Sequence, residues 1–245
     1  MLKELLIEKT PKYTEILPIS QKRVTYRPFI VREEKNLLIA KETSSFDNLM
    51  TTIQEVVNSC VTGLPEDDCK NLPFCDLEIL FLKIREKSIG EVVECFLTCP
   101  ETGERVVTSV DLRNVKISKK KASSKQTIKL DNSISLVMMY PTLETFLKIN
   151  KFEINEEESG VTELLVFCIS EVITQDEQYS TKDLSFEEVK EFVESLTAKQ
   201  FKVLLNFLKE IPTIEYTINY TTKDGVNRKI ELRGFSDFLE LFLVM

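Results

Sequence analysis

Residues 91–112, EVVECFLTCPETGERVVTSVDL, decide the fold class of this chain. Apolar and polar side chains alternate through 91–99 and again through 104–112, as expected for two strands that each bury one face. Between them, Pro100 suits the second position of a tight turn, and Gly103 suits a position with positive φ. The stretch therefore predicts a β-hairpin.

Cys95 and Cys99 lie in this hairpin and raise the question of a metal site. Four residues apart on a strand, they point to the same face but lie roughly 13 Å apart along it. Structural zinc takes four ligands, with neighbouring sulfurs roughly 4 Å apart. The return strand offers no cysteine, and the chain contains no histidine. We therefore interpret both cysteines as core-facing thiols and expect no metal and no cofactor, with a cysteine-dependent zinc-binding or nucleic-acid-contacting module as the alternative.

The sequence before the hairpin has helical rather than strand periodicity. Helices are predicted within 29–42, 44–61 and 72–88, where apolar residues recur at helical spacing. In the third of these segments Asp76 lies in the first turn and basic residues follow towards the end, which suits the helix dipole. Its apolar stripe consists of Leu77, Leu80, Phe81 and Ile84.

The sequence after the hairpin returns to helical periodicity, with strands at its two ends. A strand is predicted at 133–141, and a second hairpin at 213–235 turns at Asp224–Gly225. Between them, Ser185 with Glu188 and Thr197 with Gln200 have the spacing of capping boxes. The predicted helices begin at 142, 160, 185 and 198, and the one from 160 covers GVTELLVFCISEVIT.

These patterns predict an α+β fold made of two helix-plus-β-hairpin halves. Residues 1–115 form the N-terminal α+β half, with the hairpin at 91–112. Residues 127–245 form a mostly helical C-terminal half, with the hairpin at 213–235. Residues 116–126 form a basic linker or loop between the halves.

Composition restricts the class of protein further. The 245 residues are 42% hydrophobic and 29% charged, as in ordinary globular domains, and the formal net charge of −8 argues against binding to nucleic acid. The longest apolar runs are too short to span a membrane. Acidic residues in the first ten positions argue against a signal peptide, so we expect the six cysteines to be free thiols in a reducing compartment.

The sequence shows no pattern of an enzyme. Without histidine, a Ser-His-Asp or Cys-His nucleophile is excluded. The paired carboxylates lie in polar runs or on helix faces, where solvated charges are common, and no glycine-rich phosphate-binding motif is present. We therefore predict that the protein is not an enzyme and has no small-molecule substrate.

Two groups of residues are candidates for contacts with a partner. The first is a basic run in the connector, for which an exposed charged loop is the alternative. The second is an apolar stripe near the C-terminus, for which packing onto the chain's own core is the alternative. The candidates are Lys119, Lys120, Lys121, Phe235, Phe238, Leu239 and Phe242.

Four segments occur in a fixed order along the chain. They are YRPFIVREEKNLLIAKE (26–42), LPFCDLEILFLKIREKSIGEVVE (72–94), ISLVMMYPTLE (134–144) and LTAKQFKVLLNFLKEIP (196–212). Together they resemble the baseplate hub subunit or hub assembly family of T-even-type contractile-tailed bacteriophages. The resemblance extends from about residue 20 to the end of the chain.

The resemblance implies a structural or assembly component of the tail baseplate hub, acting through protein–protein contacts. The implied partners are other baseplate hub or tail proteins, and the implied location is the virion tail baseplate, or the host cytoplasm during tail assembly. The family supplies no catalytic residue to transfer to this chain. The hairpin edges at 104–112 and 227–233 can then add to a neighbour's sheet, because unpaired strand edges are templates for pairing.

Overall fold

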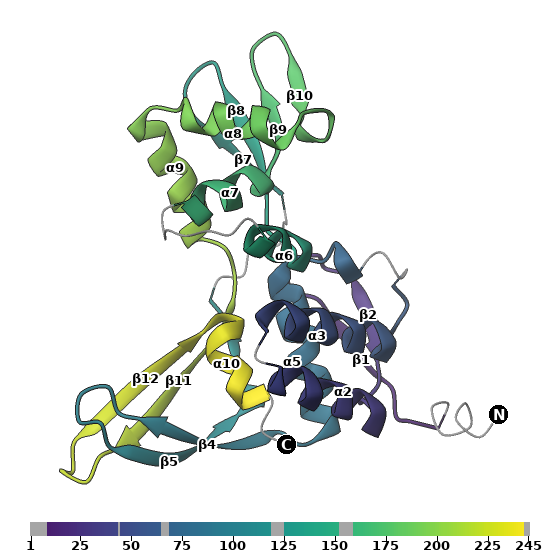
Figure 1. Cartoon of the computed structure of the whole chain (residues 1–245), viewed down its shortest axis with the longest axis vertical. Coiled ribbons are helices and arrows are strands. Elements are labelled where there is room, and N and C mark those ends of the chain that lie inside the picture. The colour runs from purple at the N-terminus through teal and green to yellow at the C-terminus, as the bar shows by residue number, and fades with distance from the viewer. Residues whose placement is uncertain (1–8, 44, 65–68, 119–124, 152–158, 243–245) are drawn as a thin grey trace. The chain divides into compact units, whose positions relative to one another are not determined.

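The computed structural model of the chain describes residues 9–43, 45–64, 69–118, 125–151 and 159–242 (Figure 1). Helices and short strands follow one another along these residues, and the strands form small open sheets. This mixed architecture confirms the predicted α+β class. The chain divides into two compact units, which are described separately below.

Unit 1 comprises Met1–Cys69, Cys75–Lys120 and Pro212–Met245. Three of its strands form an antiparallel sheet in the order β1-β2-β3. These are β1 (Tyr13–Ile16), β2 (Arg23–Tyr26) and β3 (Val61–Thr62). Its main helices are α2 (Val31–Glu42), α3 (Phe46–Cys60) and α5 (Phe74–Ser88), the last belonging to unit 1 from Cys75 onward.

Helix α5 is buried along most of its length. The predicted apolar stripe from Leu77 to Ile84 lies in the core, together with polar side chains that the core would normally exclude. The buried Asp76 carboxylate accepts the backbone N–H groups of Ile19 at 2.9 Å and Ser20 at 2.8 Å. Because each oxygen has a donor, the burial of this acid fixes the turn that precedes β2.

A buried ion pair joins the β1–β2–β3 sheet to α2 and α3. Arg27 Nη2 lies 2.7 Å from Glu33 Oε1, and both side chains are buried. Ser59 donates to the same carboxylate oxygen at 2.6 Å, and the Ile30 N–H donates to Glu33 Oε2 at 2.8 Å at the start of α2. Glu33 therefore serves both as a helix cap and as the partner of a buried cation.

Both predicted hairpins are present in unit 1. Strands β4 (Val92–Thr98) and β5 (Arg105–Asp111) form the first, and a 3-10 turn, η1 (Leu112–Asn114), follows. Strands β11 (Ile214–Thr221) and β12 (Asn227–Arg233) form the second. The second hairpin extends into a sheet in the order β12-β11-β6, where β6 is Lys116–Ile117, and α10 (Gly234–Phe242) follows it.

Unit 2 comprises Lys70–Phe74 and Lys121–Ile211. Its antiparallel sheet has the order β10-β9-β8-β7, formed by β7 (Lys125–Lys129), β8 (Ser135–Met139), β9 (Ile169–Ile173) and β10 (Gln178–Ser180). Its helices are α6 (Leu143–Lys151), α7 (Ser159–Cys168), η2 (Thr181–Asp183), α8 (Phe186–Glu194) and α9 (Ala198–Lys209). Both predicted capping boxes are confirmed, at Ser185 for α8 and at Thr197 for α9.

One prediction for this region is wrong in detail. The helix predicted from 160 through the ISEVIT sequence ends at Cys168, because Ile169–Ile173 pairs with β8 and β10 as a strand. The β-branched residues of this run suit a strand better than a helix. Of the predicted basic linker or loop, Lys116–Ile117 pairs with β11 and Lys125 begins β7, while residues 119–124 lie outside the described residues.

The compact units follow strand pairing rather than chain order. The halves predicted from the sequence, 1–115 and 127–245, place the second hairpin with the helices before it. In the structure, Ile214 pairs with Ile117, and residues from Pro212 onward group with unit 1. A local pattern cannot reveal this grouping, because the pairing joins strands far apart in sequence.

Candidate functional site

The first hairpin ends in a tight turn built from the residues that predicted it. The Cys99 N–H donates to the Glu104 carbonyl and the Gly103 N–H donates to the Cys99 carbonyl, both at 2.8 Å. Gly103 has φ of +69°, a conformation that favours glycine. The Cys99 side chain is buried, and hydrogen bonds with Thr102 and Tyr220 hold the pKa of its thiol below the usual value. The stretch that suggested a metal site is thus the tip of a hairpin.

The tip of the first hairpin is joined to the tip of the second. Glu104 Oε2 accepts the Lys223 N–H at 3.0 Å, and Glu104 Oε1 lies 3.8 Å from Lys223 Nζ. On the same side, Glu101 forms an ion pair with Arg228. We call this set of contacts between residues 99–104 and 220–228 the hairpin joint. These contacts hold strands β4, β5, β11 and β12 together, although the two turns are far apart in sequence. We call these four strands the platform.

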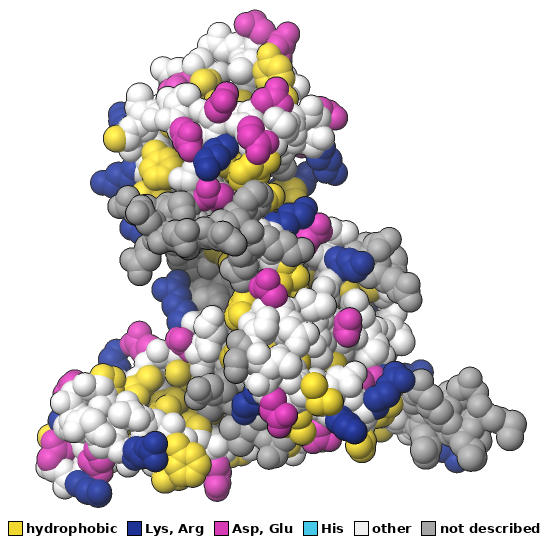
Figure 2. Space-filling model, in the orientation of Figure 1, with side chains coloured by type: hydrophobic (Ala, Val, Ile, Leu, Met, Phe, Trp, Pro, Cys, Tyr) yellow, Lys and Arg dark blue, Asp and Glu magenta, His cyan; other side chains and the backbone are white. Residues whose placement is uncertain are grey.

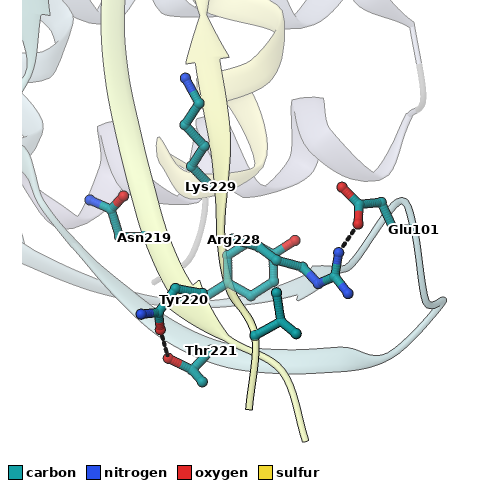
Figure 3. A pocket seen from close by; sticks show the side chains of 8 residues that line it. Glu101, Asn219, Tyr220, Thr221, Arg228 and Lys229 are labelled. Atoms are coloured by element: carbon teal, nitrogen blue, oxygen red, sulfur yellow. Dashed lines mark hydrogen bonds and ion pairs between the residues drawn. The ribbon is translucent and has the colours of Figure 1, made fainter. Parts of the chain in front are cut away.

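An open hollow of about 870 Å³ lies beside the hairpin joint (Figure 3). Its lining residues are Glu101, Asn219, Tyr220, Thr221, Val226, Asn227, Arg228 and Lys229. Several of them bind one another: Glu101 pairs with Arg228, and Thr221 Oγ1 donates to Asn227 Oδ1 at 2.8 Å. Arg228 also lies 3.0 Å from Asp224 within its own hairpin. Glu101 and Arg228 thus line the hollow and also belong to the hairpin joint, whereas the Thr221–Asn227 contact lies within the second hairpin.

The outer face of the first hairpin carries an exposed apolar pair. Phe96 and Val107 lie directly opposite each other in the register of β4 and β5, and their side chains are 76% and 65% exposed. Hydrophobic side chains are visible at the surface over the region of the two hairpins (Figure 2). The Phe96 side chain therefore buries little of its area in the isolated chain. Exposed aromatic side chains of this kind are typical of contact surfaces.

The remaining residues of this face are polar or smaller. We define the outer face as the exposed side of β4 and β5, with Glu94 opposite Ser109 and Thr98 opposite Arg105. The sequence already contained the signal for this face, because Val92 and Phe96 alternate with the buried Val93 and Cys95. Both sides of β4 are thus partly apolar.

The two groups of candidate contact residues are placed differently. Lys119, Lys120 and Lys121 lie outside the described residues. Phe235 and Phe238 are 4% and 0% exposed, and the Phe235 ring lies 5.9 Å from that of Phe81. These two side chains belong to the core of unit 1, the alternative considered above. Leu239 is half-buried, the side chain of Phe242 lies outside the described residues, and a role for either in partner contacts stays a prediction.

The six cysteines are buried and carry no disulfide. Burial raises the pKa of Cys168 and of Cys60 to about 12. Within the described ranges, no three His, Cys, Asp or Glu side chains are grouped so that they could hold a metal ion. The described part of the chain also contains no helix that is both long and apolar enough to cross a membrane.

The two hairpins are joined by their own polar side chains, and the first of them bears an exposed apolar face. The comparison with protein families shows that the chain belongs to the family described as T4 bacteriophage base plate protein, whose model matches residues 10–240. Neither curated proteins nor solved structures gave a match. Membership makes the protein a component of the bacteriophage tail baseplate that contacts other baseplate or tail proteins, and confirms the T4-type baseplate resemblance.

Proposed function

We propose that the protein is a non-enzymatic structural or assembly component of the baseplate hub and that it acts through protein–protein contacts. The observation that carries the proposal is the hairpin joint. By holding the tips of both hairpins through Glu104 and Arg228, it keeps four strands in one orientation without help from a partner. A prearranged surface loses less conformational entropy on binding than a flexible one.

Strand edges of this platform suit contact with neighbours. Strand β12 is the last strand of its sheet, so one side of its backbone has no partner among the described strands. Lys229, Glu231 and Arg233 are exposed along it. Such charges discourage uncontrolled pairing, while the free backbone groups still accept a strand from a matching neighbour.

The polar groups of the hollow support a role without catalysis. Catalytic acids and bases need access to a substrate in addition to suitable pKa values. Arg228 instead binds both Glu101 and Asp224, and Thr221 binds Asn227. We therefore assign Arg228 to stabilising the hairpin joint, and Thr221 with Asn227 to stabilising the second hairpin.

The test is a phage that lacks the gene. We expect heads but no functional tails by electron microscopy, and rescue when the intact chain is supplied. Rescue should weaken with Glu104→Ala, which removes the contacts of Glu104 with Lys223 in the hairpin joint, and persist with Glu187→Ala, which removes an exposed carboxylate of α8. Normal tails without the protein would overturn the proposal. A mass-spectrometric inventory of purified virions then separates a permanent subunit from an assembly factor.

A further inference from the structure

The outer face of the first hairpin has a charge pattern that is complementary to itself. Glu94 lies two residues before Phe96 on β4, and Arg105 lies two residues before Val107 on β5. Because the strands are antiparallel, the two charges lie at opposite ends of the face, each roughly 7 Å along the strand from the apolar pair. Both are exposed, and neither forms a salt bridge with another described residue.

We propose that this face binds the same face of a second copy of the chain. When a two-fold axis runs through the Phe96–Val107 pair and across the strands, the apolar pair of one copy covers that of the other. Glu94 of each copy then lies over the end of the partner's face that carries Arg105. The contact is isologous, since the same residues serve on both sides.

The charges also select the direction in which the faces meet. If the two hairpins packed parallel, Glu94 would lie near Glu94 and Arg105 near Arg105, and like charges would face each other. In the antiparallel arrangement, both contacts join opposite charges, which favours that arrangement over the parallel one. A heterologous partner would have to present the same pattern of an apolar centre between an acid and a base.

The size of the face sets the expected strength. A two-stranded face of seven residues covers roughly 23 Å by 10 Å, well below the roughly 800 Å² per partner of a standard interface. We therefore expect weak self-association of the free chain. The contact forms more readily where copies are already held near one another, because the high local concentration then compensates for the weak affinity. The proposal does not depend on a role in the hub.

Disulfide trapping tests the geometry. Val107 lies beside the two-fold axis, so Val107→Cys should form a cross-linked dimer under mild oxidation at a few hundred micromolar protein. Val92→Cys is the matched control, because Val92 is also exposed on this face but lies four residues from Phe96, roughly 13 Å from the axis. It should stay monomeric. The native cysteines are buried and contribute little background. Equal cross-linking of the two variants, or none in either, would overturn the proposal.

Charge exchange tests the complementarity. Glu94→Arg leaves a base at both ends of the face, and Arg105→Glu leaves an acid at both ends. Each single variant should weaken self-association about tenfold or more in sedimentation experiments over a concentration series, and the double variant should restore it. An equal mixture of the two single variants should associate, because every contact is again complementary. The proposed interface would be contradicted by single variants that associate like the unchanged protein. It would also be contradicted by a double variant that is folded by circular dichroism but does not recover association. Neither result would bear on the hub assignment.

Discussion

Glu78 in α5 accepts a hydrogen bond from the Thr213 hydroxyl at 3.2 Å, across 135 residues of sequence. The same carboxyl group accepts the Ile214 N–H at 3.3 Å and belongs to a residue that is only 1% exposed. Burial outweighs these hydrogen bonds and raises the pKa of Glu78 to about 8. A buried acid thus joins α5 to the start of β11.

This carboxyl group should make unit 1 less stable at alkaline pH. Between pH 4.5 and 8, the folded state keeps a proton on Glu78 that the unfolded state has lost, so stability falls as the pH rises. The expected loss is on the order of 3 kcal/mol. Glu78→Gln cannot ionise and should flatten much of this decline, leaving a smaller slope from Asp76, whose pKa burial also raises. Calorimetry at pH 5 and pH 8 checks this, and an unchanged slope in Glu78→Gln would contradict it.

Gly234 should tolerate a side chain less well than Gly225. Both have positive φ, +74° and +77°, so alanine at either position costs about 1 kcal/mol in backbone strain. At Gly234 the new Cβ would also lie 3.2 Å from Thr213 Oγ1, whereas at Gly225 it would meet open space. Gly234→Ala therefore disturbs the Thr213–Glu78 hydrogen bond as well. Chemical denaturation should show the larger loss of stability for Gly234→Ala. Equal losses would show that the close approach to Thr213 does not affect stability.

Removal of the Glu33 carboxylate should strongly destabilise unit 1. Burial by itself would raise the pKa of Glu33, but hydrogen bonds from Arg27, Ser59 and the Ile30 N–H outweigh it and lower the pKa to about 2. Stability from this group is present above pH 4.5 and is lost as the pH falls towards 2. Glu33→Ala leaves the Arg27 charge buried, at an expected cost of about 3–5 kcal/mol in urea unfolding. Glu34→Ala, on the next residue of α2, should change stability by about 0.5 kcal/mol or less.

Loss of the hairpin joint should be visible locally. Glu104→Ala removes the acceptor of the Lys223 N–H, so that amide should exchange its hydrogen faster, and stability should fall by about 1 kcal/mol. Glu101→Ala is the comparison, because the Glu101 side chain is largely exposed and Arg228 keeps its contact with Asp224, so this loss should cost less. Amide exchange measured by NMR distinguishes the two. Unchanged exchange at Lys223 in the Glu104 variant would show that the tips are held by other contacts.

Local signals in the sequence predict the local parts of the fold well. The stripe of α5 and the capping boxes that begin α8 and α9 act within one or two turns of helix, so residue spacing reveals them. The tight turn at Gly103 is equally local. By contrast, Ile169–Ile173 is apolar enough for either helix or strand, and the neighbouring strands β8 and β10 decide its conformation.

The candidate site was harder to predict, because the exposure of its residues depends on contacts with segments far apart in sequence. Periodicity correctly predicts a helical stripe at Phe235 and Phe238, but the position of Phe81 determines that the stripe faces the core. Alternation places Phe96 and Cys95 on opposite faces of β4, and the interpretation of the cysteines as core-facing is confirmed by their burial. The pattern does not show that the opposite face, with Phe96, has no cover in the described part of the chain.

The pairing of β6 with β11 also has a consequence for synthesis on the ribosome. The Ser118 N–H donates to the Thr213 carbonyl at 2.9 Å, so the chain leaves unit 1 and returns to it at neighbouring points. A nascent chain that has emerged only as far as residue 118 lacks β11, the partner of β6, and the donors of Glu78. Unit 1 can therefore complete its folding only after its segment from Pro212 onward has been translated, and the order of translation favours unit 2 as the first of the two to finish.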